Sequence, residues 1–360
     1  MTQTFPIRRQ RVMRELKRRS LDCLLVTHPA NWYYLTGFTG ESGVLVMAPG
    51  GTTLITDGRF TTQAREESPG IRLELQKGSL YASVGEWLNH RGIRRVGYDP
   101  ERWTVAQLKV LRKACGAHCR IIEAGGVVEA LRLTKDAQEL AAMRRAAILA
   151  GEVLEGTLKL LKPGIREREV GAEIEYQMKR KGASGPSFET IVAFGERAAL
   201  PHARPTSKRL RKNELVVLDL GVILGHYCSD ITRTVHLGRA SRRIRSWYRA
   251  VQEANQAATA AVRAGVACGE VDAAAREVLK KSGLDSYFVH STGHGLGLEV
   301  HEAPRVARGQ AIRLEVGNVI TIEPGVYVEG VGGIRIEDDV AVGVKGSEVL
   351  TRVRRDLIEL

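Results

Sequence analysis

The chain has 360 residues, which is enough for two domains with hydrophobic cores of their own. Its composition of 43% hydrophobic and 26% charged residues is that of a globular protein and excludes a disordered or fibrous chain, and no apolar run is long enough to cross a membrane. The net charge of +13 raises nucleic-acid binding as an alternative, but there is no nucleic-acid motif and the aromatic content is only 5%, so we do not expect such a partner.

The first 130 residues alternate apolar segments with amphipathic ones. The apolar segments predict strands at residues 22–26, 43–47, 52–56, 71–75, 95–98 and 120–122. The amphipathic segments predict helices at residues 6–19, 59–67, 81–90 and 105–114. Strands that alternate with helices favour layered packing, so we expect an α/β N-terminal domain over residues 1–130.

One aromatic segment of this domain, from Asn31 to Gly37, is expected to be a loop. It contains Trp32, Tyr33 and Tyr34, which are candidates for an interface or for the rim of a cleft. Packing of these side chains inside the domain is the alternative.

In residues 131–360 the expected helices and strands occur in separate groups, which predicts a second domain of the α+β class. Helices are expected at residues 134–161, 166–181, 242–264 and 269–282. Thr134 is expected to be the N-cap of the first. A strand is expected at residues 190–193, and the segments around Asp219 and Asp230 predict a hairpin that turns near Gly225. Two helices followed by strands, twice over, indicate an internal two-fold repeat of structure.

Five residues of this second domain are candidate metal ligands: Asp219, Asp230, His294, Glu323 and Glu337. Asp219 lies inside an apolar run, where an ionised carboxylate costs on the order of several kcal/mol unless a positive charge meets it. Asp230 heads a stretch of alternating polar residues, and Glu323 ends an apolar strand. His294 lies between glycines, which allow the backbone to approach a ligand closely. Taken singly, each residue could also be a strand-end, turn or surface residue.

The charges of this set favour two divalent cations. Four ionised carboxylates carry about −4, and without metal they would repel one another and take up protons. Two divalent ions would balance them, and a bridging water or hydroxide would become a strong nucleophile at neutral pH. Ligands that are mostly oxygen, with one histidine and no cysteine, favour Mn²⁺, with Co²⁺ or Zn²⁺ as alternatives.

The order and the flanks of these residues resemble the metallopeptidase family of methionine aminopeptidase, aminopeptidase P and prolidase. The matching segments are Leu218-Asp-Leu-Gly221, Ser229-Asp-Ile-Thr-Arg-Thr234, Thr292-Gly-His-Gly-Leu-Gly297, Val300-His-Glu302, Ile322-Glu-Pro-Gly325 and Arg335-Ile-Glu337. The resemblance implies the pita-bread fold for residues 131–360. Residues 1–130 resemble the extra N-terminal domain of the aminopeptidase P and prolidase branch, which methionine aminopeptidases lack.

The resemblance also implies roles for residues around the metal. His202 and His301 match histidines that contact the substrate and transfer protons, and His290 matches a further substrate-binding histidine. For each of the three, a loop or core histidine bonded to the backbone is the alternative. Arg335 shares a strand face with Glu337 and could orient a carboxylate or bind substrate; a simple ion pair with Asp339 is the alternative. Arg204 departs from the small, glycine-containing segment that relatives often have after this histidine, which puts the substrate range in doubt.

The expected function is therefore hydrolysis of an Xaa-Pro bond by a metalloexopeptidase. The substrate would be either the N-terminus of a peptide, as for an Xaa-Pro aminopeptidase, or a dipeptide, as for a prolidase. Attack by a metal-bridging hydroxide is the expected mechanism. A non-catalytic pita-bread binding module and a metal-independent, creatinase-like hydrolase are the alternatives, and the complete ligand set argues against both.

The cellular location and the oligomeric state are predicted from features outside the site. No apolar signal core follows the basic N-terminus, and the five cysteines include no CxxC pair, so we expect a cytoplasmic protein. Relatives with the extra domain are commonly dimers, and two-fold symmetry is the commonest for oligomers, so a homodimer is expected.

Overall fold

The computed structural model describes residues 4–360, which divide into a first unit that ends at Arg132 and a second unit, Leu133–Leu360. The two are described separately. The boundary lies two residues after the one expected from the sequence. Among the described residues, no helix is both long and apolar enough to pass through a bilayer.

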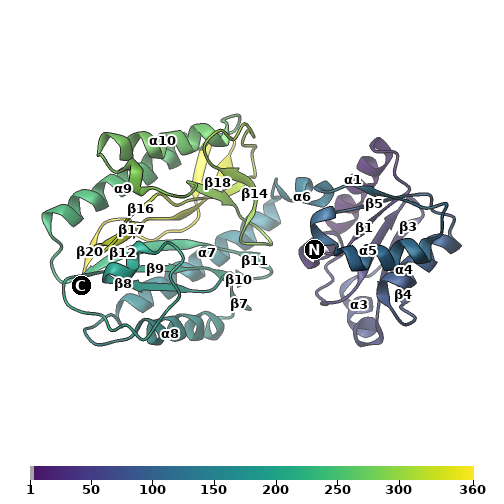
Figure 1. The fold of residues 1–360 in the computed structure, drawn as a ribbon, viewed down its shortest axis with the longest axis horizontal. Coiled ribbons are helices and arrows are strands. Elements are labelled where there is room, and N and C mark those ends of the chain that lie inside the picture. The colour runs from purple at the N-terminus through teal and green to yellow at the C-terminus, as the bar shows by residue number, and fades with distance from the viewer. Residues whose placement is uncertain (1–3) are drawn as a thin grey trace. The chain divides into compact units, whose positions relative to one another are not determined.

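The first unit contains six strands and six α-helices between residues 4 and 132 (Figure 1). The strands are β1 (Cys23–Val26), β2 (Val44–Ala48), β3 (Gly51–Thr56), β4 (Arg72–Leu75), β5 (Arg95–Tyr98) and β6 (Arg120–Glu123). The helices are α1 (Thr4–Arg18), α2 (Pro29–Thr36), α3 (Thr61–Glu67), α4 (Leu80–His90), α5 (Val105–Cys115) and α6 (Val127–Arg132). The strands form one mixed sheet with the order β4-β3-β2-β1-β5-β6, so the expected α/β class is confirmed.

The aromatic segment expected to be a loop is instead helix α2. Trp32 and Tyr34 are 2% and 1% exposed, so they pack inside the unit and are not interface or rim residues. Pro29 begins the helix and Gly37 ends it in the left-handed conformation, with φ of 82°. The aromatic composition of this segment suggested a loop, but the segment is a helix whose aromatic side chains are buried by tertiary packing.

The second unit contains two helical pairs, each followed by strands. The helices are α7 (Ala137–Leu158), α8 (Glu167–Arg180), α9 (Arg242–Ala261) and α10 (Cys268–Lys281). The strands after the first pair are β7 (Gly185–Pro186), β8 (Ile191–Phe194), β9 (Glu214–Leu220), β10 (Val222–Leu224), β11 (Tyr227–Cys228) and β12 (Ile231–Leu237). Those after the second pair are β13 (Gly293–Gly295), β14 (Glu302–Val306), β15 (Val319–Ile322), β16 (Gly325–Val328), β17 (Gly332–Arg335), β18 (Asp338–Gly343), β19 (Gly346–Val349) and β20 (Ile358–Glu359).

Two larger sheets hold the centre of this unit, with the orders β20-β12-β9-β8 and β14-β13-β15-β18-β19. Helices α8 and α10 lie on opposite sides of the strands (Figure 1). The apolar faces of α7 and α8 pack with β8, β9 and β12, and those of α9 and α10 pack with β15 and β18. This repeated helix-pair arrangement is the expected pita-bread organisation, and the α+β class is confirmed.

The start of α7 differs from the expectation. Asp136, and not Thr134, is its N-cap, because the Asp136 carboxylate accepts hydrogen bonds from the backbone N–H groups of Gln138 and Glu139. The Glu139 carboxylate in turn accepts from the Asp136 N–H at 3.0 Å. This reciprocal capping box outcompetes the threonine two residues earlier.

Candidate active site and metal centre

Two of the candidate ligands are positioned by the antiparallel pairing of β9 with β12. Asp219, in β9, lies opposite Thr232 in β12, and Asp230 directly precedes β12. Asp230 is held further by its backbone N–H, which donates to Asp339 Oδ2 at 3.1 Å. Apolar neighbours along both strands bury the two aspartate residues, which are 7% and 5% exposed as whole residues. The predicted hairpin is present, with its turn at Gly225, where φ is 58°.

The other three candidates come from the second half of the unit. His294 lies in β13, Glu323 follows β15, and Glu337 lies between β17 and β18. The glycines beside His294 are required by close packing, since a Cβ atom at Gly293 would collide with the backbone of Thr321 and one at Gly295 with that of Ala303. Antiparallel pairing of β13 with β15 therefore brings the imidazole to the same place as the Glu323 carboxylate.

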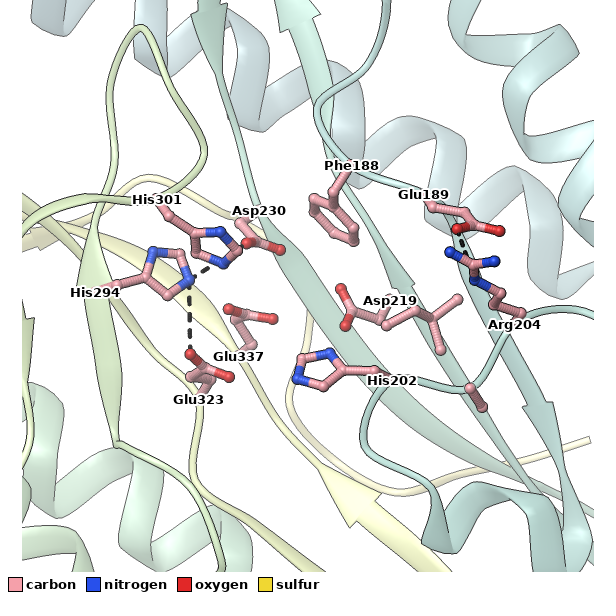
Figure 2. Close-up of a pocket in the computed structure, with 12 residues that line it drawn as sticks. Phe188, Glu189, His202, Arg204, Asp219, Asp230, His294, His301, Glu323 and Glu337 are labelled. Atoms are coloured by element: carbon pink, nitrogen blue, oxygen red, sulfur yellow. Dashed lines mark ion pairs between the residues drawn. The ribbon is translucent and has the colours of Figure 1, made fainter. Parts of the chain in front are cut away.

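All five candidates line one cavity of about 270 Å³ (Figure 2). Ligand atoms of Asp230, His294 and Glu337 lie within 4.8 Å of one another. His294 Nε2 lies 3.8 Å from Asp230 Oδ2 and 3.6 Å from Glu323 Oε1. Asp219 faces the cavity from the opposite side, beside His202 (Figure 2). The structure thus brings together residues that are far apart in the sequence.

Most of the charges in this cavity are uncompensated, because Asp219 is the one of its four candidate carboxylates that pairs with a cationic side chain of the described residues. Burial first, and then the neighbouring carboxylates, raises the pKa of Asp230 and of Glu337 above the ordinary range. Burial, and next among the raising causes Asp219, raises the pKa of Glu323 to about 8, although Arg335 acts in the opposite direction. Within residues 4–360, Asp219 Oδ1 and Asp230 Oδ1 are buried without a hydrogen-bond partner. Such atoms are rare in proteins, and a bound cation is a partner that would satisfy these carboxylate oxygens.

The histidine fits the same interpretation. His294 Nδ1 contacts the carbonyl oxygen of Gly295 at 3.1 Å, so this nitrogen carries the proton and Nε2 presents a lone pair. Burial and His301 lower the pKa of His294 to about 4, which keeps the ring neutral. A lone pair that faces carboxylate oxygens is repelled unless a cation lies between them. The donor set therefore fits divalent cations.

Arg335 holds one of the candidate ligands directly and a second through Thr232. Its Nη2 donates to Asp219 Oδ2 at 2.5 Å, and its Nε donates to Thr232 Oγ1 at 3.1 Å. Thr232 Oγ1 donates to Glu337 Oε2 at 2.6 Å. Arg335 therefore contacts Asp219, and the alternative of an ion pair with Asp339 is wrong.

The three further histidines lie at the same site. His202 and His301 line the ligand cavity and also an adjoining cavity of about 410 Å³, and the His301 ring lies edge-on to His294 with 4.4 Å between centroids. His290 lines only the larger cavity. Burial and Arg335 lower its pKa to about 4, and its Nδ1 contacts the carbonyl oxygen of Ser291, so its Nε2 accepts from the Tyr327 hydroxyl at 2.8 Å.

A model of metallopeptidase family M24 matches residues 141–343, and a model of the creatinase/prolidase N-terminal domain matches residues 8–134. The Xaa-Pro dipeptidase of Pyrococcus furiosus is 35% identical, over 98% of this chain and 99% of that protein. The chain belongs to metallopeptidase family M24. The expectation of a metalloexopeptidase of the aminopeptidase P and prolidase branch is confirmed.

Solved structures of M24 relatives have the same fold. The structure of an Xaa-Pro dipeptidase from Bacillus anthracis matches with a TM-score of 0.96 and 35% identity, over 99% of this chain and 100% of that one. An X-Pro aminopeptidase from Thermotoga maritima matches with a TM-score of 0.89 and 32% identity, over 96% and 100%.

Several residues of this M24 site were not found from the sequence. Arg305 lines the larger cavity, and the Tyr327 hydroxyl accepts a hydrogen bond from Arg335, which also lines it. Asp272 holds the segment that leads to His294 by accepting from Thr292 Oγ1 at 2.8 Å. The sequence around each of these residues gives no signal of a functional site, so only the tertiary contacts identify them. Arg204, noted as a departure from relatives, pairs with Glu189 at 3.0 Å on the exposed rim of the ligand cavity (Figure 2).

Proposed function

We propose that this M24 protein is a two-metal exopeptidase that hydrolyses the Xaa-Pro bond of dipeptides. One observation carries the proposal: four carboxylates and a neutral histidine converge on one cavity, with buried carboxylate oxygens that lack a partner. A protein that only bound a peptide would gain nothing from this arrangement, because burying like charges together is costly without a cation.

The five residues proposed to hold the ions are Asp219, Asp230, His294, Glu323 and Glu337. Two divalent ions, when bound, supply a nucleophile at neutral pH and polarise the scissile carbonyl group. Mn²⁺ is the ion that we propose, because the ligands are mostly carboxylate oxygens, with Co²⁺ and Zn²⁺ as alternatives.

The remaining residues act on the substrate and its protons. His202 and His301 border both cavities, so each can reach a peptide that lies across them, and we assign them substrate contact and proton transfer. Burial lowers the pKa of His301, which keeps it available to accept a proton. Arg335 orients Asp219, and His290 borders the substrate from the larger cavity, where Tyr327 fixes its ring.

The Xaa-Pro specificity is supported by the relatives, which are Xaa-Pro dipeptidases and an X-Pro aminopeptidase. A bond to proline is a tertiary amide without an N–H group, so a site that grips the carbonyl group is suited to it. The larger cavity supports dipeptides over longer peptides. Arg305 lines it with an exposed side chain that has no ion pair or hydrogen bond within residues 4–360, and a guanidinium group there could pair with the free carboxylate of a dipeptide.

Homodimer formation and a cytoplasmic location stay predictions.

The test is an assay of Gly-Pro, Gly-Pro-Ala and Gly-Ala on protein treated with chelator and then given no metal, Mn²⁺ or Co²⁺. We expect hydrolysis of Gly-Pro only with metal, slower hydrolysis of the tripeptide and none of Gly-Ala. Full activity in protein that elemental analysis finds free of metal would refute the two-metal function. Arg305→Met should lower kcat/KM for Gly-Pro more than for the tripeptide; an equal loss for both would exclude carboxylate recognition by Arg305.

A further inference from the structure

Asn255 is a buried polar residue on the apolar face of α9. It is 0% exposed, and its neighbours on that face, Val251, Ala254 and Ala258, are also fully buried. Its Nδ2 donates to the carbonyl oxygen of Ile322 at 2.9 Å and to that of Ile336 at 3.1 Å. Both partners can only accept hydrogen bonds, so the amide nitrogen must be the group that faces them.

The two carbonyl groups are those directly before Glu323 and Glu337. The N–H groups of the same peptide units are also held: that of Glu323 donates to the Thr292 carbonyl oxygen at 2.8 Å, and that of Glu337 to the Thr232 carbonyl oxygen at 3.1 Å. Each peptide plane that carries a proposed ligand is thus fixed at both ends, and Asn255 is the residue common to the two.

The sheet register explains why a clamp is needed here. Strands β15 and β18 are antiparallel, and their pairing ends with Ile322 opposite Asp338. One step further, the register places Glu323 opposite Glu337. Like charges opposite each other on paired strands are destabilising, so without a cation the pairing is weakest at this point. Asn255 connects the two backbones where the ladder stops.

The oxygen of the same amide group does not explain why this position is polar. Asn255 Oδ1 is buried without a partner among residues 4–360. An unpartnered buried amide oxygen is destabilising, and an apolar side chain would avoid that cost. The double donation to Ile322 and Ile336 is what an apolar residue could not supply.

We propose that Asn255 is a positioning residue that fixes the separation of Glu323 and Glu337 and thereby sets the affinity for divalent ions. The inference rests on the proposed two-metal function. Residues that orient metal ligands without touching the metal commonly change metal affinity or activity by about 10- to 100-fold when they are replaced. Asn255 acts on the backbone of two ligands at once, so its effect should fall on the binding of metal.

The experiment compares Asn255→Ala with Val251→Ala, which opens a cavity one turn earlier on the same helix but removes no hydrogen bond. Thermal unfolding of the metal-free proteins measures the structural effect, and calorimetric titration with Mn²⁺ measures the Kd. We expect both variants to lower the Tm, the Mn²⁺ Kd of Asn255→Ala to rise by about 10- to 100-fold, and that of Val251→Ala to stay unchanged. Asn255→Asp, which keeps the shape but leaves at most one donor, takes the place of Asn255→Ala if the latter does not fold.

An unchanged Mn²⁺ Kd in the folded Asn255 variant would overturn the inference while leaving the two-metal function intact. An equal loss of affinity in Val251→Ala would overturn it too, because the effect would then follow from packing alone. Wild-type protein that binds no Mn²⁺, Co²⁺ or Zn²⁺ would refute the proposed function, and this inference with it.

Discussion

Arg335 Nη2 lies 2.5 Å from Asp219 Oδ2, although 116 residues separate the two in the chain. Both side chains are nearly buried, with 4% and 9% exposure. One of the four proposed carboxylate ligands therefore has a cation of the protein beside it, and the formal charge of the four carboxylates and this guanidinium is −4 + 1 = −3. Asp230, Glu323 and Glu337 have no such partner among the described residues, so they depend most strongly on metal.

Replacing Arg335 by lysine should lower turnover while the fold survives. Lysine keeps the charge but cannot contact Asp219, Thr232 and Tyr327 together, as the guanidinium does. We expect kcat of Arg335→Lys to fall by about 10- to 100-fold, as for other residues that orient metal ligands. Arg144→Lys, which alters a surface ion pair with Glu348, is the control and should leave kcat unchanged. Wild-type kinetics in Arg335→Lys would contradict the orienting role.

Replacing His202 by alanine should affect catalysis and not metal binding. His202 lies at the border of the two cavities and outside the proposed ligand set. We expect kcat to fall by about 10²- to 10⁴-fold, the usual contribution of acid–base catalysis, with metal content unchanged by elemental analysis. The exposed His118 supplies a matched control, His118→Ala, with normal activity. Loss of metal from His202→Ala would instead make His202 a ligand.

Glu337→Gln should abolish turnover and stabilise the metal-free protein. The amide keeps the side-chain shape and can still accept from Thr232 Oγ1, but it cannot ionise and so removes one carboxyl group from a buried cluster. Because burial raises the pKa of Glu337, this carboxyl group in the metal-free wild type must either take up a proton on folding or repel its neighbours, and both cost stability. We therefore expect the Tm of Glu337→Gln in chelator to exceed that of wild type. With saturating Mn²⁺ the order should reverse, because wild type keeps the full ligand set. A lower Tm for the variant in chelator would mean that repulsion is already relieved without metal.

The stability of the metal-free protein should fall as pH rises above neutrality. The pKa of Glu323 is about 8 in the folded protein, against about 4.3 for an unfolded glutamate. A carboxyl group whose pKa is raised by folding binds more protons in the folded state, so its stabilising contribution is complete below the unfolded pKa and is lost as pH rises through the folded one. The pKa values of His290 and His294 are lowered to about 4 in the folded protein. These two residues make stability rise with pH, but only below their unfolded pKa of about 6.5, so they do not affect this range.

We therefore expect the Tm in chelator to be lower at pH 8.5 than at pH 7, measured by differential scanning calorimetry. Glu323→Gln should reduce this difference, and Mn²⁺ should remove it. A Tm that does not fall between pH 7 and pH 8.5 in chelator would show that Glu323 is already ionised at neutral pH.

Local patterns were sufficient for most of the secondary structure. The apolar segments of the first unit became β1 to β6 with ends shifted by at most one residue, because strand formation follows from an apolar run bounded by turn residues. Helix α6 was not predicted, and two further errors lie where local signals compete. Helix α2 has an aromatic composition that also suits loops, and two residues near the start of α7 could each have served as its cap.

The sequence by itself was sufficient to propose the five metal ligands, because carboxylates in or beside apolar strands are anomalous wherever those strands lie. It could not determine which of them meet. The contact of Arg335 with Asp219, the clamp of Asn255 on the backbones before Glu323 and Glu337, and the link from Tyr327 to His290 all depend on strand register and helix packing between distant segments. A shift of one residue in that register would turn the same side chains away from the cavity, so only the tertiary structure decides these contacts.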